Sequence, residues 1–275
     1  MQNVTQCSAD NAKGGIVAEM IEGLPQVDAQ IERIWRSVLT GGHSHRLSFL
    51  PGAPKCATCR IPMKGLSGLI VETFTGLRQS RKNPNICNLC DDNLPMGGAE
   101  VDIAVLFADV RGSTTLAEKV GPTAFAQLLN RFYRVANNVI ISKWGLIDKM
   151  VGDEVMALFL PNTGHYRENA VSAAVELLRG LGYGSAGGGW IPVGVGVHAG
   201  TAFVGRIGSS EAHDFTALGD TINSGARLQA LAQPGEIVMS EEIYRGVGDR
   251  YPGLESRRVE LRGRSEAVDV RVLHL

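Results

Sequence analysis

One apolar run in the chain ends in a carboxylate and passes directly into a turn of small residues. Residues 101–109 (VDIAVLFAD) are apolar and rich in β-branched side chains, which predicts a buried strand ending at Asp109. Gly112, Ser113 and Thr114 follow, and small residues of this kind are typical of a helix N-terminus. Backbone N–H groups at such a terminus are open to an anion. The segment therefore predicts a carboxylate beside an anion site.

A second carboxylate is expected at the tip of a hairpin. Residues 149–159 (KMVGDEVMALF) are two apolar runs separated by Gly152 and Asp153. A glycine and an aspartate between two strand-like runs predict a tight turn. The Asp153 carboxylate would project from that turn.

Four separated motifs resemble those of the class III nucleotidyl cyclases, in the order in which that family carries them. The resemblance runs from about residue 101 to the C-terminus and implies the family's α+β, ferredoxin-like catalytic domain. The motifs are residues 107–114 (FADVRGST), 149–153 (KMVGD), 194–200 (GVGVHAG) and 218–227 (LGDTINSGAR).

The order of apolar and polar segments also predicts an α+β domain, with an antiparallel or mixed sheet and helices on one face. After the first strand we expect a helical region at 115–143, a hairpin at 146–160, a helix at 166–180, strands at 191–198 and 202–207, a helix at 220–232 and a terminal strand near 267–274.

The resemblance implies two Mg²⁺ or Mn²⁺ ions in each active site. The family holds them with carboxylates at the positions of Asp109 and Asp153 and with the backbone carbonyl at Val110. Hard oxygen ligands of this kind suit magnesium or manganese. Two such ions can stabilise the attacking ribose 3′-oxygen and the leaving pyrophosphate together.

By family position, Lys149 and Thr216 contact the base of the substrate. A lysine ammonium only donates hydrogen bonds, which suits N1 of adenine, and a threonine hydroxyl can accept from the exocyclic amine. ATP is therefore the expected substrate and the protein an adenylyl cyclase. A threonine can also donate to O6 of guanine, so guanylyl cyclase activity stays open.

The transition-state residues implied by the resemblance are Asn223 and Arg227, which share one face of the expected helix. Arg262 is expected at the β- and γ-phosphates, with Arg264 in reserve and Arg111 on the other side of the triphosphate. Gly112, Ser113 and Thr114 would contribute backbone N–H groups to the same phosphates.

The family assembles each site from two subunits, and this chain carries both halves. A symmetric homodimer with two equivalent sites is therefore expected. A catalytically weak nucleotide-binding regulator, acting through a separate cysteine-rich segment, remains the alternative from another functional class.

That segment, here called the cysteine unit (residues 50–96), contains two C-x-x-C pairs separated by 27 residues: Cys56, Cys59, Cys87 and Cys90. Two such pairs are the arrangement that closes a tetrahedral four-cysteine site. The ligand set suits Zn²⁺, and an iron–sulfur cluster uses the same four thiolates.

The expected organisation is a helical segment at 1–49, the cysteine unit at 50–96 and a catalytic domain at 97–275. A chain of 275 residues with 44% hydrophobic residues can fill these cores. It has no apolar run long enough for a membrane span and no signal peptide, so cytoplasmic residence without a membrane partner is expected. A net charge of −1 gives no general attraction to nucleic acid, and we expect no such partner.

Overall fold

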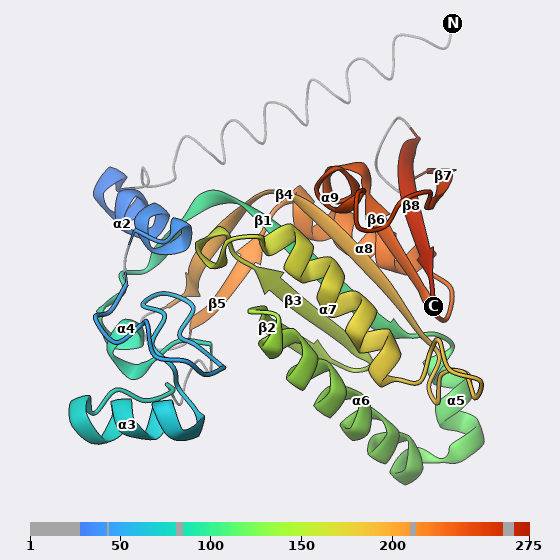
Figure 1. Cartoon of the computed structure of the whole chain (residues 1–275), viewed down its shortest axis with the longest axis horizontal. Coiled ribbons are helices and arrows are strands. Elements are labelled where there is room, and N and C mark those ends of the chain that lie inside the picture. Colours follow the sequence, from blue (N-terminus) through green and yellow to red (C-terminus); the bar gives the residue numbers. More distant parts are fainter. Residues whose placement is uncertain (1–27, 43, 81–84, 210–212, 261–266) are drawn as a thin grey trace, which may run out of the picture.

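The computed structural model describes residues 28–42, 44–80, 85–209, 213–260 and 267–275 (Figure 1). The described residues form an 8-stranded sheet in the order β2-β3-β1-β4-β6-β8-β7, and β5 pairs with β4 outside this path. All neighbours are antiparallel except β4 and β6, which are parallel. The strands are β1 (Gly97–Val110), β2 (Leu146–Val151), β3 (Glu154–Phe159), β4 (Val193–Gly208), β5 (His213–Leu218), β6 (Glu236–Ser240), β7 (Glu255–Val259) and β8 (Val268–His274).

Helices lie on both faces of this sheet. They are α2 (Ala29–Thr40), α3 (Gly65–Thr75), α4 (Asn88–Asn93), α5 (Ser113–Val120), α6 (Pro122–Ser142), α7 (Tyr166–Gly180), α8 (Asp220–Leu231) and α9 (Glu241–Val247), with a short 3₁₀ turn, η1 (Pro161–Thr163). Figure 1 shows α6 and α7 crossing one face, and α3 and α4 at the opposite end of the molecule from β7 and β8.

The residues of β1 alternate between two cores, because successive side chains of a strand point to opposite faces. Ala104, Leu106 and Ala108 pack with buried residues of α6, α7 and α9. On the other face, Val105 and Phe107 belong to a core that includes α2 and the cysteine unit. The expectation of helices on one face only was wrong, because α8 and α2 cover the second face.

Gly225 shows how closely α8 approaches that second face. A Cβ atom at this position would lie 2.7 Å from Cγ2 of Val105 and 3.0 Å from the Phe107 ring. Glycine in a helix costs roughly 1 kcal/mol relative to alanine. The close contact between α8 and β1 explains why the chain has a glycine at this position.

Two expected boundaries were wrong. The helical region expected at 115–143 is two helices, because Gly121 has φ 79 between α5 and α6 and Pro122 begins a new helix. The strands expected at 191–198 and 202–207 are one strand, β4, which pairs with β1 over its whole length from Val110–Val193 to Gly97–Arg206. The residues between the two expected strands continue the ladder.

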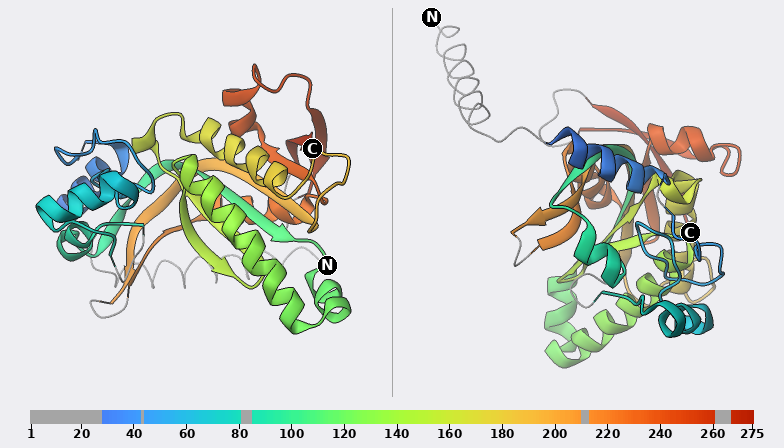
Figure 2. Two further views of the ribbon diagram at one scale, coloured as in Figure 1. Left: turned by 60° about the horizontal axis from the view of Figure 1, so that its bottom comes forward. Right: turned by 90° about the vertical axis from the view of Figure 1, so that its left-hand side faces the viewer.

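The cysteine unit shares its core with the large sheet. Cys56, Cys59, Ile61 and Ile86 are buried in the same cluster as Val101 and other residues of β1. Figure 2 shows α2, α3 and α4 together at this end of the sheet. Packing of this kind couples the order of the cysteine unit to the stability of β1.

Polar contacts also hold the unit in place. Arg206 of β4 donates to the backbone carbonyl of Asp91 at 2.8 Å, and Nε2 of His213 lies 3.3 Å from the Asp91 carboxylate. Asn162 of η1 donates to the carbonyl of Ala57 at 2.6 Å.

Among the described helices, none is long and apolar enough to cross a membrane.

Candidate active site

The two expected metal carboxylates lie together at one end of β1. Asp109 pairs across the β1–β3 ladder with Glu154, the residue that follows Asp153. The backbone N–H of Val110 donates to the carbonyl of Asp153 at 3.3 Å. Gly152 has φ 63 in the β2–β3 turn, which favours glycine. Strand pairing therefore brings Asp109, Val110 and Asp153 to one place.

The electrostatics of this group suit a divalent cation. Burial and the nearby charge of Asp153 raise the pKa of Asp109 to about 6, and the Arg111 guanidinium 3.0 Å away opposes this shift. Two carboxylates that repel each other in a partly buried place are stabilised when a cation neutralises them. The donor set, all oxygen, fits Mg²⁺ or Mn²⁺.

The turn and the helix that follow β1 complete this end. Tyr133 of α6 donates its hydroxyl hydrogen to the carbonyl of Gly152 at 2.5 Å and so fixes the β2–β3 turn. Gly112 has φ 65 at the start of α5, and no side chain caps the helix. The N–H groups expected to meet phosphates, at Gly112, Ser113 and Thr114, therefore lie next to the carboxylates along the chain.

The expected base-contacting pair also meets. Lys149 of β2 donates to the hydroxyl of Thr216 of β5 at 2.8 Å, although 67 residues separate them in the sequence. Thr216 is buried and the Lys149 side chain is 46% exposed. The Lys149 ammonium is thus held by Thr216, while about half of the Lys149 side chain stays accessible to a ligand.

Asp148 joins this pair, and sequence reasoning missed it. Its Oδ2 accepts from Thr216 at 2.9 Å and lies 3.1 Å from the Lys149 ammonium. Strict alternation along a strand would put Asp148 and Lys149 on opposite faces, but the β2–β3 register shifts between Ile147 and Lys149. The sequence signal that could have identified Asp148 is its position directly before the expected base-contacting lysine.

The expected transition-state residues lie on α8. Asn223 is exposed, and the Arg227 guanidinium is 3.9 Å from the Asp220 carboxylate of the same helix. In the described part of the protomer, no hydrogen bond or ion pair joins Asp109 or Asp153 to Lys149, Thr216, Asn223 or Arg227. Arg262 and Arg264 lie outside the described residues.

The four cysteines of the cysteine unit converge. Their sulfur atoms all lie within 4.8 Å of one another, and all four residues are buried. Burial opposes charge on Cys56, yet hydrogen bonds from the other three thiols lower its pKa well below the usual value. Clustered buried sulfurs with a stabilised thiolate fit a bound metal cation.

The comparison with protein families decides the identity of the larger part of the chain. The sequence model of the adenylate and guanylate cyclase catalytic domain matches residues 98–273. The chain belongs to this cyclase family. The match includes both carboxylates and the pair formed by Lys149 and Thr216, and it confirms the resemblance seen in the motifs.

Curated relatives of this cyclase are longer proteins. An adenylate cyclase of Anabaena cylindrica is 29% identical over 191 residues, which cover 65% of this chain and 38% of that protein. The terminal-differentiation-specific adenylate cyclase of Dictyostelium discoideum is 30% identical over 190 residues, which cover 65% of this chain and 9% of that protein. The matched segment of this chain thus covers less than half the length of these relatives.

Solved cyclase structures confirm the α+β fold. The guanylyl cyclase Cya2 superposes with a TM-score of 0.58 at 27% identity, covering 64% of this chain and 93% of that chain. The adenylyl cyclase CyaB from P. aeruginosa gives a TM-score of 0.56 at 26% identity, covering 64% and 95%. Both nucleotide specificities therefore occur among similar folds.

Proposed function

We propose that the protein is an adenylyl cyclase that converts ATP to 3′,5′-cyclic AMP and pyrophosphate at the interface of a homodimer. The observation that carries this proposal is the pairing of Lys149 with Thr216 on a domain that also brings Asp109 and Asp153 together. The first pair suits an adenine base, and the second suits the cations that accompany a triphosphate.

The chemistry requires in-line attack of the ribose 3′-hydroxyl on the α-phosphorus. Asp109, Asp153 and the carbonyl of Val110 would hold two Mg²⁺ or Mn²⁺ ions, which supply Lewis-acid stabilisation of the oxygens that gain charge. Arg227 contributes a fixed positive charge near the α-phosphate, and Asn223 orients the ribose. The N–H groups at the start of α5 bind the remaining phosphates, together with Arg262 as a proposal from sequence.

The lack of a described contact between the two residue groups supports a dimer. Within the described part of one protomer, Asp153 in the β2–β3 turn lies beside Asp109 of β1, and no hydrogen bond or ion pair joins these carboxylates to Lys149 or Thr216. A two-fold axis would place one protomer's carboxylates opposite its partner's base-contacting pair and would create two equivalent sites. A single protomer would then be inactive.

The cysteine unit is proposed as a metal-stabilised regulatory segment. Zinc–sulfur bonds of about 2.3 Å in a tetrahedron place sulfur atoms about 3.8 Å apart. Sγ of Cys59 lies 3.7 Å from Sγ of Cys87, and the whole set spans no more than 4.8 Å. This spacing favours a single Zn²⁺ ion, because an iron–sulfur cluster inserts several atoms between its cysteines.

Guanylyl cyclase activity is the second candidate, since the similar Cya2 structure is described as a guanylyl cyclase. Turnover of ATP and GTP by the purified chain, with Mg²⁺ and with Mn²⁺, separates the candidates. We expect cyclic AMP formation, with kcat/KM for ATP at least ten times that for GTP. Equal efficiencies would contradict the assignment to ATP, and nucleotide binding without turnover under either metal would favour a regulator.

A further inference from the structure

The hydrogen bonds around Thr216 fix the direction in which its hydroxyl can act. A threonine hydroxyl has one hydrogen and two lone pairs. Thr216 donates that hydrogen to Oδ2 of Asp148 at 2.9 Å and accepts from the Lys149 ammonium at 2.8 Å. One lone pair of Thr216 is left, so toward a base the hydroxyl can only accept.

Lys149 is left with the complementary capacity. Its ammonium has three donors, of which one bonds to Thr216 and one to Asp148. The remaining pattern is one donor on Lys149 beside one acceptor on Thr216. Adenine offers N1 as an acceptor beside the N6 amine as a donor, whereas guanine offers an N1–H donor beside the O6 acceptor. With Lys149 at N1 and Thr216 at position 6, the order implied by family position, this pattern fits adenine and opposes guanine.

Burial makes Asp148 a firm partner in this network. Its side chain is 1% exposed, and its Oδ1 is buried without a hydrogen-bond partner in the described structure. Thr216 is buried as well. In such a place an exchange of the Thr216 hydrogen bond for one to water is costly.

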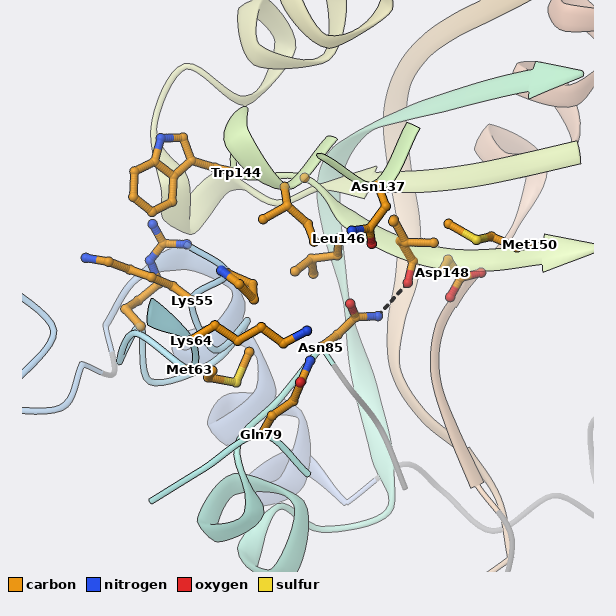
Figure 3. A pocket seen from close by; sticks show the side chains of 15 residues that line it. Lys55, Met63, Lys64, Gln79, Asn85, Asn137, Trp144, Leu146, Asp148 and Met150 are labelled. Carbon is orange, nitrogen blue, oxygen red and sulfur yellow. Dashed lines mark hydrogen bonds between the residues drawn. The ribbon is translucent and has the colours of Figure 1, made fainter. Parts of the chain in front are cut away.

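The strand that carries Asp148 is held by the cysteine unit. Asn85 donates to the backbone carbonyl of Ile147 at 2.6 Å, at the point where the β2–β3 register shifts (Figure 3). A cavity of about 300 Å³ lies beside this contact and is lined by Asn85, Asn137, Ile147 and Asp148 among others. The Asn85 bond is thus a described polar contact between the cysteine unit and this part of β2, at the edge of the cavity.

We propose that Asp148 is a specificity-determining positioning residue, which holds Thr216 as a hydrogen-bond acceptor so that the site selects a 6-aminopurine nucleotide, and that Asn85 links this setting to the cysteine unit. The proposal rests on the proposed function, since it assumes that Lys149 and Thr216 meet the base. It accounts for selectivity that a threonine alone does not provide, because an unbound threonine hydroxyl could turn and donate to O6.

The test compares kcat/KM for ATP, GTP and ITP in the full chain and in variants. ITP carries N1–H and O6 but lacks the 2-amino group of GTP, so it isolates the contacts at positions 1 and 6 from any contact at position 2. In Asp148→Ala we expect the ATP-to-GTP and ATP-to-ITP ratios to fall about tenfold or more, mainly through KM. Thr216→Val should lower the ratios as well, and Asp148→Ala added to Thr216→Val should change them little further.

Asp249→Asn is the matched control, since it removes an exposed carboxylate that has no described contact with Asp148, Lys149 or Thr216 and should leave both ratios unchanged. The proposed link to the cysteine unit is tested with Asn85→Ala, which should also lower both ratios, by a smaller factor than Asp148→Ala does. Asn137→Ala, which changes another residue of the same cavity, should leave the ratios unchanged.

Three outcomes decide the matter separately. Ratios unchanged within twofold in a folded, active Asp148→Ala enzyme would overturn the specificity role. Unchanged ratios in Asn85→Ala would overturn the link to the cysteine unit. If the wild-type chain turns over none of the three nucleotides, the proposed function on which the inference rests is contradicted instead.

Discussion

Replacing Asp109 or Asp153 by alanine should lower cyclase turnover by about 10³-fold or more, because each variant removes a carboxylate proposed to hold the catalytic cations. The fold should survive. The β1–β3 backbone pairing and the bond from the N–H of Val110 to the carbonyl of Asp153 join the two segments, and neither variant removes them. Initial rates with ATP under saturating Mg²⁺ or Mn²⁺ measure the loss.

Thermal unfolding is the control for structure. The pKa of Asp109 in the folded protein, about 6, lies above its ordinary value of 3.8, so the protonated carboxyl stabilises the fold and this contribution is lost as the pH rises through about 6. At pH 8 and without metal, Asp109→Ala should therefore melt no lower than the wild type on electrostatic grounds. Substantial residual turnover in a dimeric variant would contradict the metal assignment.

Removing Cys56 and Cys87 together should disorder the cysteine unit and lower the unfolding temperature by more than about 10 °C. A unit of this size buries little apolar surface of its own, so we expect a bound ion to supply part of its folding free energy. Its residues share a core with Val101 and Ile103, so their loss would also uncover one face of β1. Differential scanning calorimetry of the double serine variant measures the change.

Cys7→Ser is the matched control, because Cys7 is the remaining cysteine of the sequence and belongs to neither C-x-x-C pair. It should leave the unfolding temperature and the metal content unchanged. Elemental analysis should find about one zinc per chain in the wild type and none in the double variant. Protein prepared without air that contains neither zinc nor iron with sulfide would contradict the metal-stabilised unit.

Sequence patterns were sufficient to predict an element where its local residue preferences agree with the tertiary structure around it. The run ending at Asp109, the turn at Gly152 and the helix expected at 166–180 all correspond to described elements, with α7 at Tyr166–Gly180. The pairing of Lys149 with Thr216 was expected only from family position, because no local pattern joins residues on β2 and β5. The sheet brings them together.

The differences arise from tertiary structure. Gly200 and its neighbours were expected to interrupt a strand, but pairing with β1 on one side carries β4 through them. Asp148 was missed because period-two alternation fails at the shift in register, which only the β2–β3 pairing reveals. The fold of α8 against β1 could be anticipated from Gly225, whereas the core shared with the cysteine unit has no sequence signature.

The central claim, an adenylyl cyclase whose site is shared between two identical subunits, is tested most directly by mixing two inactive variants. Asp109→Ala and Lys149→Ala should each be inactive alone. After subunit exchange in equal amounts, half of the dimers carry one intact site, so cyclic AMP formation should recover to about a quarter of the wild-type rate. No recovery, with heterodimers demonstrated by differently tagged chains, would contradict the shared site.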